Sequence, residues 1–260
     1  MGENYILDNA WAQARRRLGL LEQLYDPGTI RCLEGVGVKP GWRCLEVGPG
    51  AGSIARWLCA QAGPSGRVVA VDLDTRFVEE LAAEEANLEV LQRDVVADGI
   101  PGGGYDLIHA RMVLIHIPTR QQLLEALVAS LRPGGWLVIE DGDTFAVSTL
   151  ADGPYAEFWR TLAVAFESAG MHPTWARDLP GLFDRLGLEE VDASCDVGLY
   201  RGGSPFTEVL TISLEQVRPL VLAAGATEAQ LEEISAVVAD PTQWFPGWGM
   251  VSVRGRAPVV

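Results

Sequence analysis

From Val38 onward, short apolar runs alternate with segments whose apolar residues recur every three or four positions. The first pattern is typical of buried strands and the second of helices with one buried face. The strands predicted in this way are 43–48, 67–74, 88–94, 105–111 and 136–141. Strands that alternate with helices predict an α/β fold, with a mostly parallel sheet covered by helices on both faces.

The segment before Val38 has a helical pattern. A helix is predicted over 8–25, a turn at Asp26–Thr29 and a second short helix over 29–36. Three consecutive arginines occupy positions 15–17. We interpret them as the solvated flank of the first helix, and a functional basic patch is the alternative.

The remainder of the chain is less regular. The pattern predicts a helix over 155–170, a strand over 189–202, a helical segment over 206–240 and a final strand over 250–256. Thr119 with Gln122, and Thr227 with Gln230, match the capping box that opens a helix. The sequence RPGG at 132–135 is expected to end the first of these two helices.

Composition narrows the range of partners. The chain has 260 residues, of which 48% are hydrophobic, and a formal net charge of -15 from 20 basic and 35 acidic residues. A chain this apolar can bury a full core. A nucleic-acid partner is not expected, because phosphate contacts need Lys and Arg. The same charge argues against binding to an anionic membrane surface.

Cysteine and histidine usage predicts neither disulfides nor a metal. The four cysteines form no C-x-x-C pair, and three of them lie in apolar segments, as is typical of reduced, buried thiols in the cytosol. The three histidines lack the spacing of a zinc site. The N-terminus does not resemble a secretory signal, and no apolar run is long enough to span a membrane. We therefore expect a cytoplasmic protein.

The turn in CLEVGPGAGSIARWL (44–58) contains Gly48, Gly50 and Gly52 and joins a predicted strand to a predicted helix. Ligands of parallel α/β sheets bind at such turns. A phosphate-binding P-loop requires a terminal G-K-[ST], and this turn contains no lysine. A dinucleotide-binding turn has the spacing G-x-G-x-x-G, and here Ser53 occupies the position of the third glycine.

Carboxylates at the ends of three consecutive strands sharpen the choice of ligand. Glu46 ends the first strand, where it would repel a pyrophosphate and attract a cation; pairing with Arg43 or Arg67 is the alternative. Asp72 ends the second strand, where a carboxylate accepts hydrogen bonds from a ribose diol. Asp94 ends the third, where it can accept from an exocyclic amine. Together these residues indicate a ligand with a positive group, a ribose and an amino-bearing base, and without phosphate.

Such a ligand is S-adenosylmethionine. The segment LEVGPGAG resembles motif I of the class I S-adenosylmethionine-dependent methyltransferases, and VVAVDLD, LQRDVV and YDLIHARMVLIHIP resemble the segments that follow it in that family. The resemblance covers about 40–145. It implies a three-layer fold with a seven-stranded, mostly parallel sheet whose last strand is antiparallel. It also implies a helical lid at 1–39, a core of 40–200 and 246–260, and a helical insertion at 201–245.

The resemblance implies a role for each matched position. The residues expected to bind the cofactor are Glu46, Gly48, Gly50, Gly52, Asp72, Asp94, Val95 and Arg111. The glycines would let the backbone approach the methionyl part of the cofactor, and Glu46 would lie nearby. Asp72 would bind the ribose and Asp94 the adenine amine, with Val95 stacking or donating its N–H. Arg111 would meet the cofactor carboxylate.

His116, which follows the fourth strand, is the candidate catalytic base, because its unperturbed pKa of about 6.5 suits proton abstraction. The alternative is a residue that caps the loop before Pro118. His109 is interpreted as a hydrogen-bonded core residue. Asp141 and Asp143 are expected either to bind a polar or cationic acceptor at the edge of the site or merely to shape a turn. The aromatic residues expected in the wall of an acceptor pocket are Tyr200, Phe206, Trp244, Phe245 and Trp248.

The sequence therefore predicts methyl transfer from S-adenosylmethionine to a small-molecule acceptor, such as a natural-product intermediate, by a monomer or a homodimer. One alternative is an enzyme of the same fold that binds the cofactor without transferring the methyl group, such as a cyclase or a decarboxylase. Others are an NAD(P)-dependent oxidoreductase and a cofactor-sensing module without catalysis. Fold alone does not choose the acceptor.

Overall fold

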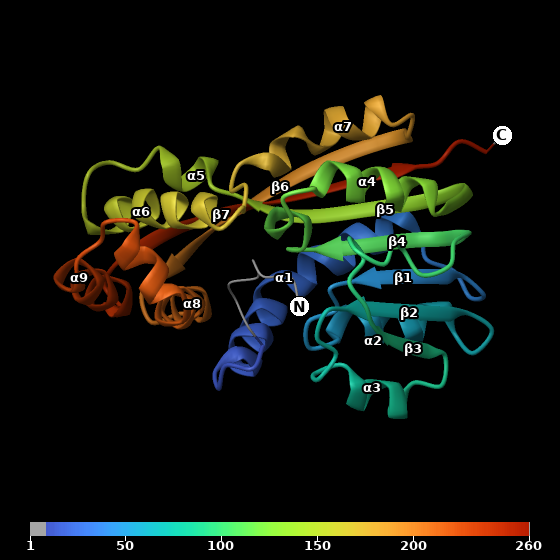
Figure 1. Ribbon diagram of the computed structural model, residues 1–260, viewed down its shortest axis with the longest axis horizontal. Coiled ribbons are helices and arrows are strands. Elements are labelled where there is room, and N and C mark those ends of the chain that lie inside the picture. Colours follow the sequence, from blue (N-terminus) through green and yellow to red (C-terminus); the bar gives the residue numbers. More distant parts are fainter. Residues whose placement is uncertain (1–8, 260) are drawn as a thin grey trace.

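The computed structural model describes residues 9–259 and contains a seven-stranded sheet with the order β3-β2-β1-β4-β5-β7-β6 (Figure 1). Strands β1 to β5 pair in parallel, and β7 lies antiparallel between β5 and β6. The strands are β1 (Arg43–Val47), β2 (Arg67–Asp72), β3 (Leu88–Gln92), β4 (Tyr105–Arg111), β5 (Leu131–Asp143), β6 (Glu189–Arg201) and β7 (Trp244–Arg256). The predicted fold class, with its antiparallel last strand, is confirmed.

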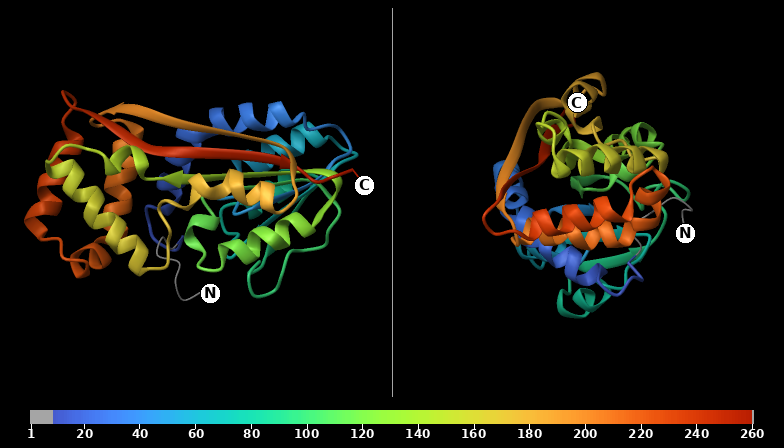
Figure 2. Two further views of the ribbon diagram at one scale, coloured as in Figure 1. Left: turned by 90° about the horizontal axis from the view of Figure 1, so that it is seen from above. Right: turned by 90° about the vertical axis from the view of Figure 1, so that its left-hand side faces the viewer.

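Helices cover both faces of the sheet (Figure 2). The first part of the chain provides α1 (Ala14–Val36), α2 (Ser53–Ala62), α3 (Glu79–Glu84) and α4 (Arg120–Ala129). The second part provides α5 (Phe145–Ser148), α6 (Pro154–Ser168), α7 (Leu179–Arg185), α8 (Pro205–Ala223) and α9 (Glu228–Ala239). Short 3-10 helices lie at Leu114–His116 and Trp175–Asp178. No helix within residues 9–259 is long and apolar enough to cross a membrane.

Alternation along the central strands separates two apolar layers. Cys44 packs with apolar residues of α1 and α2, whereas its neighbour Leu45 packs with those of α4 and α7. The same alternation places Leu107 and Val138 on the α1 face. Two residues further along each of these strands are Glu46, His109 and Glu140, which therefore face α1 as well.

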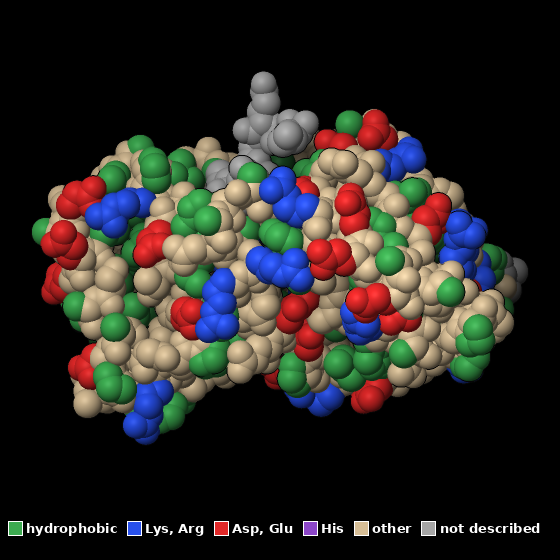
Figure 3. Space-filling model, turned by 90° about the horizontal axis from the view of Figure 1, so that it is seen from below, with side chains coloured by type: hydrophobic (Ala, Val, Ile, Leu, Met, Phe, Trp, Pro, Cys, Tyr) green, Lys and Arg blue, Asp and Glu red, His purple; other side chains and the backbone are tan. Residues whose placement is uncertain are grey.

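A second apolar cluster lies beyond the carboxyl ends of the parallel strands, at the left of Figure 1. The long strands β6 and β7 extend into this region, where α6, α8 and α9 pack together. Helices α8 and α9 lie between β6 and β7 in the chain, as predicted for the helical insertion. On the face shown in Figure 3, acidic and basic side chains are interspersed rather than gathered into a basic patch.

The N-terminal prediction was wrong in two respects. Asp26–Thr29 is not a turn, because α1 continues through Pro27 to Val36, and the segment 9–13 precedes the helix. Residue 8, where the helix was predicted to begin, lies outside the described residues. A proline removes one helical hydrogen bond. Here side-chain contacts from Asp26 and Thr29 to the sheet and α2 hold the helix on both sides of Pro27.

Two further local predictions were wrong. RPGG belongs to β5, which begins at Leu131, because Leu131 pairs with Tyr105 and the N–H of Gly134 donates to the carbonyls of Ala257 and Pro258. Thr119 precedes α4, but its side chain accepts no capping hydrogen bond. The capping box at Thr227 is confirmed, as are the helix predicted over 155–170 and the strand predicted over 189–202.

The two threonines provide a matched test of helix capping. Thr227→Ala should lower the free energy of unfolding by about 1 kcal/mol, since its hydroxyl accepts from the N–H of Gln230. Thr119→Ala should change it by less than about 0.5 kcal/mol. Urea unfolding of both variants measures the difference, and equal losses would contradict the assignment of the cap.

Candidate functional site

A cavity of about 660 Å³ opens at the carboxyl ends of β1, β2 and β4. One end is formed by the glycine turn after β1 and by the residues that follow β2 and β3. The other end is formed by apolar residues of α6 and α8, including Phe158, Trp159 and Leu210. Helix α1 contributes Leu18 and Leu21 between the two ends. The cavity therefore joins the glycine turn to an apolar chamber.

The glycine turn bends in a way that favours residues without a side chain. Gly48, Gly50 and Gly52 have φ angles of 68°, 59° and 99°, in the left-handed region where only glycine is unstrained. A Cβ at position 48 would collide with the side chain of Val113. Leu18 of α1 packs over Gly50. A Cβ added at Gly50 would lie 3.6 Å from Cδ2 of Leu18. Backbone atoms of Gly48 and Gly50 thus line the cavity closely.

Asp72, Asp94 and Val95 all line the same end of the cavity. Burial raises the pKa of Asp72 to about 6, although backbone N–H groups of Asp74 and Leu73 act in the opposite direction. Asp94 Oδ1 accepts from the N–H of Val96 at 2.9 Å and so also closes the turn after β3. The structure brings these three residues together from two neighbouring strand ends.

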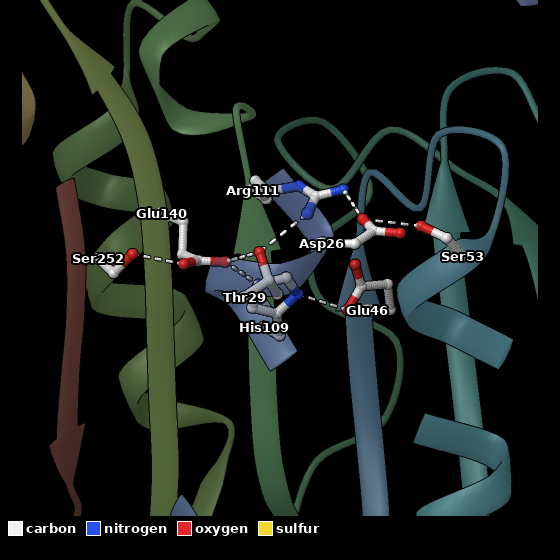
Figure 4. A network of polar contacts seen from close by, with 8 residues as sticks. All are labelled: Asp26, Thr29, Glu46, Ser53, His109, Arg111, Glu140 and Ser252. Atoms are coloured by element: carbon white, nitrogen blue, oxygen red, sulfur yellow. Dashed lines mark hydrogen bonds and ion pairs between the residues drawn. The ribbon is translucent and has the colours of Figure 1, made fainter. Parts of the chain in front are cut away.

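Glu46 belongs to a buried polar network rather than to an arginine pair (Figure 4). Its Oε2 lies 2.7 Å from His109 Nδ1, and His109 Nε2 lies 3.2 Å from Glu140 Oε2. Glu140 also accepts from the hydroxyls of Thr29 and Ser252. The network joins β1, β4, β5, β7 and α1, and it confirms that His109 is a hydrogen-bonded core residue.

Attraction between opposite charges stabilises this network. Burial alone disfavours the imidazolium, but the carboxylates of Glu46 and Glu140 outweigh burial and raise the pKa of His109 to about 9. Burial likewise disfavours the charged form of Glu140, yet the hydrogen bond and charge of His109 hold its pKa below the usual value. One protonated histidine thus lies between two buried carboxylates at neutral pH.

Arg111 lines the cavity, but its guanidinium is already engaged. Nη2 donates to Asp26 Oδ1 at 2.9 Å and Nη1 donates to Thr29 Oγ1 at 2.8 Å. Asp26 accepts in addition from the hydroxyl of Ser53, the residue that follows the glycine turn (Figure 4). Arg111 therefore fixes α1 against the end of β4 and the start of α2.

His116 lines the cavity where the glycine-turn end meets the apolar chamber. Burial, and next the positive charge of Arg17, lower its pKa to about 4. The imidazole is therefore neutral at physiological pH and able to accept a proton, although it is a weaker base than the unperturbed value suggested.

Asp141 and Asp143 are committed to structural contacts. Asp141 accepts from Trp175 Nε1 at 2.9 Å and from the N–H of Ile115 at 3.1 Å. Burial raises the pKa of Asp141 to about 7, against these hydrogen bonds. Asp143 forms an ion pair with Arg177. The expected turn around Gly142 is absent, because Gly142 lies within β5 and pairs with Met250 of β7. Gly142 itself lines the cavity.

The aromatic wall was mostly predicted at the wrong positions. Trp248 lines the cavity as expected. Tyr200 stacks on Phe206 at a centroid distance of 4.2 Å, Phe245 lies in the second apolar cluster and Trp244 is 57% exposed. The aromatic lining instead comes mainly from α6, whose Phe158, Trp159 and Phe166 face the cavity. Periodicity identified α6 as a helix but did not say which surface its buried face meets.

Arg17 is the functional candidate that sequence analysis missed. It was interpreted as solvated, yet it is only 4% exposed and lines the cavity. The sequence did indicate that Arg17 could be buried, because it lies three residues after Ala14 and four before Leu21. Both of these residues belong to the expected buried stripe. The side chains of Arg15 and Arg16 are each 62% exposed, as predicted.

A family model for a methyltransferase domain matches residues 6–193 of this chain. The match covers well over half of the chain, which therefore belongs to this family. The identification as a class I S-adenosylmethionine-dependent methyltransferase, made from the motifs around the glycine turn, is confirmed.

Individual similarities are more distant. Methyltransferase str3 of Strobilurus tenacellus is 30% identical over 145 residues, which is 55% of this chain and 51% of that protein. Methyltransferase str2 of the same organism is 31% identical over 39% of this chain and 36% of that protein. This chain thus matches about half or less of these relatives. Phosphoethanolamine N-methyltransferase 2 of Haemonchus contortus, solved with phosphomonomethylethanolamine and S-adenosylhomocysteine, has the same fold with a TM-score of 0.63 and 17% identity, covering 99% of this chain and 60% of that one.

The buried network leads us to predict that replacing His109 lowers the free energy of unfolding, and that the size of the loss depends on pH. His109→Gln should lower the free energy of unfolding by about 3–5 kcal/mol near neutral pH, because two buried carboxylates lose the cation between them. The folded pKa of about 9 exceeds the ordinary 6.5, so the stabilisation is complete below pH 6.5 and disappears as the pH rises through 9. Denaturant unfolding across this range measures the effect.

Arg31→Gln serves as the control, since Arg31 pairs with Asp196 on the surface, where both side chains are mostly exposed. This variant should lose less than about 1 kcal/mol. A His109→Gln loss that stayed constant up to alkaline pH would show that the imidazolium is not the stabilising species.

Proposed function

We propose that this chain transfers the methyl group of S-adenosylmethionine to a small, largely apolar acceptor such as a natural-product intermediate. The observation that carries the proposal is the continuity of the cavity, which joins the glycine turn and the strand-end carboxylates to an apolar chamber. Its volume of about 660 Å³ lies within the usual range for small-molecule sites, about 300–1,000 Å³. Its enclosure by α1, α6 and α8 favours a small acceptor over a macromolecular surface.

The residues present fit S-adenosylmethionine. Asp72 offers a partly buried carboxylate at the place where a ribose diol would donate. The open backbone of Gly48 and Gly50 leaves room for the methionyl part, and Val95 supplies an apolar surface for the adenine. Glu46 reaches the same end of the cavity, with one oxygen bound to His109. When bound, the cofactor supplies an electrophilic methyl group on a sulfonium.

The protein then has two tasks, to orient the acceptor and to exclude water. Correct orientation contributes up to about 7–11 kcal/mol to reactions of this kind. Phe158, Trp159 and Leu162 of α6 pack in one apolar cluster with Leu210 and Leu214 of α8, and these side chains keep the chamber apolar. Helix α1 closes the remaining side through Leu18 and Leu21, in keeping with the lid expected at 1–39.

His116 is the residue that we assign to proton removal from the acceptor. It lies where the two ends of the cavity meet, and its lowered pKa keeps it in the proton-accepting form. The low pKa also implies that this imidazole works best with an acidic acceptor group. A base of this kind contributes on the order of 100- to 10,000-fold to the rate.

Cofactor binding should depend on the ionisation of Asp72. Because the carboxylate form accepts from the ribose hydroxyls, the affinity for S-adenosylhomocysteine should fall as the pH drops through about 6. Asp72→Asn should bind at least about tenfold more weakly and lose this pH dependence. Titration calorimetry with S-adenosylhomocysteine measures both effects.

Asp184→Asn, on the exposed side of α7, is the control and should bind like the wild type. If NAD stabilised the protein against heat and S-adenosylhomocysteine did not, the proposed cofactor would be wrong.

Methyl transfer itself is tested with S-adenosylmethionine labelled in its methyl group, incubated with a cellular extract and the purified chain. Label should enter the small-molecule fraction, and His116→Gln should reduce the rate on the order of 100-fold or more with unchanged binding of S-adenosylhomocysteine. His172→Gln, an exposed histidine outside the cavity, should leave the rate unchanged.

Label in protein or nucleic acid would contradict the proposed acceptor class. Cofactor binding without any transfer of label would favour an enzyme that uses the cofactor without consuming its methyl group. Equal rates for His116→Gln and the wild type would remove His116 from the mechanism.

A further inference from the structure

Arg17 is a buried cation inside the cavity. The residue is 4% exposed, and its Nε and Nη2 are buried without a hydrogen-bond partner. Each of the other two arginines of the run pairs with a glutamate on the surface. A buried guanidinium has lost its hydration, which is costly unless an anion replaces the water. The site is therefore electrostatically incomplete in the protein itself.

The geometry of α1 places Arg17 toward the acceptor end of the cavity. Successive helical residues are rotated by about 100°. Leu18 and Glu22 face the glycine turn, where Leu18 packs over Gly50 and Glu22 accepts from the N–H of Ser53. On the other side of the helix, Arg16 pairs with Glu208 of α8.

Gln13 and Leu20 also contact α8 from that second side. Arg17 lies on the helix surface between the side that faces the glycine turn and the side that faces α8. It is one residue from Arg16 and four from Gln13, both of which contact α8. Its charge also reaches His116, which we assign to the acceptor. The side of α1 that carries Arg17 is therefore turned more toward α8, and its charge acts on His116.

A second unpaired donor lines the same cavity. The indole N–H of Trp248 is buried without a hydrogen-bond partner, and an indole can only donate. Trp248 packs against the cluster of Leu20, Val209 and Ile212, which includes the residues of α8 that face α1. Two donor-only groups, one of them charged, call for a ligand with anionic acceptor oxygens.

From this arrangement we propose that the acceptor carries a carboxylate, or an equivalent oxyanion, which Arg17 binds inside the cavity while the apolar body of the acceptor occupies the chamber. This inference rests on the proposed function and defines its substrate class. Arg17 is then a specificity-determining residue, and the acceptor is an amphipathic organic acid.

The test uses the full chain with and without S-adenosylhomocysteine. The probes are benzoate, 3-phenylpropionate and octanoate, each paired with its neutral amide, and calorimetry gives the affinities. At least one carboxylate should bind about tenfold or more tightly than its amide to the wild type. Arg17→Met should abolish that difference, whereas Arg15→Met, at an exposed arginine of the same run, should preserve it.

Several outcomes overturn the proposal. One is that no carboxylate binds, or that each amide binds as tightly as its acid. Another is that Arg17→Met weakens S-adenosylhomocysteine but not 5′-methylthioadenosine, which lacks the amino-acid portion, because Arg17 would then hold the cofactor's own carboxylate. If Arg17→Met does not fold, the comparison of each acid with its amide on the wild type still decides whether the cavity prefers a carboxylate.

Failure of the two proposals can be told apart. If S-adenosylhomocysteine binds but the carboxylates show no preference, the inference about Arg17 fails and the proposed function stands. If S-adenosylhomocysteine does not bind, the proposed function fails, and the carboxylate preference of the protein without cofactor still tests the anion site.

Discussion

The buried pairing of His109 with Glu46 and Glu140 is the interaction on which the architecture around the site depends. Three charged side chains lie buried between the sheet and α1, beside the apolar cluster that contains Cys44 and Leu107. Buried charge is tolerated only when it is paired and hydrogen-bonded. The network satisfies both conditions by taking partners from several strands and from α1. The relative positions of these elements are thus coupled to one electrostatic arrangement.

Helix α1 is held by this network and forms one side of the binding cavity. Through Thr29 it contacts Glu140, and through Asp26 it contacts both Arg111 and the residue after the glycine turn. These contacts hold α1 over the carboxyl ends of the strands despite a proline within the helix. The first turns of α1 then lie between the glycine turn and α8, and the cavity is closed on that side.

The two ends of the cavity are lined by different kinds of chemical groups. Carboxylates and open backbone lie at the ends of β1, β2 and β3, whereas aromatic and aliphatic side chains of α6 and α8 form the chamber. Arg17 and His116 lie between these regions, one as a permanent cation and the other as a neutral imidazole. An acceptor that brings a negative charge would meet the first and transfer its proton to the second.

The sequence by itself determined the α/β fold and the place of the glycine turn, because strand periodicity and glycine spacing are local properties of the chain. The seven-stranded sheet was implied by the resemblance of its motifs to the class I methyltransferases. The sequence also placed Asp72 and Asp94 at one edge, since the carboxyl ends of parallel strands coincide. Only the tertiary structure decided that His109 is the partner of Glu46, that α6 supplies the aromatic lining and that Arg17 is buried. Those facts depend on which helix covers which surface, and local patterns identify a buried face without identifying what buries it.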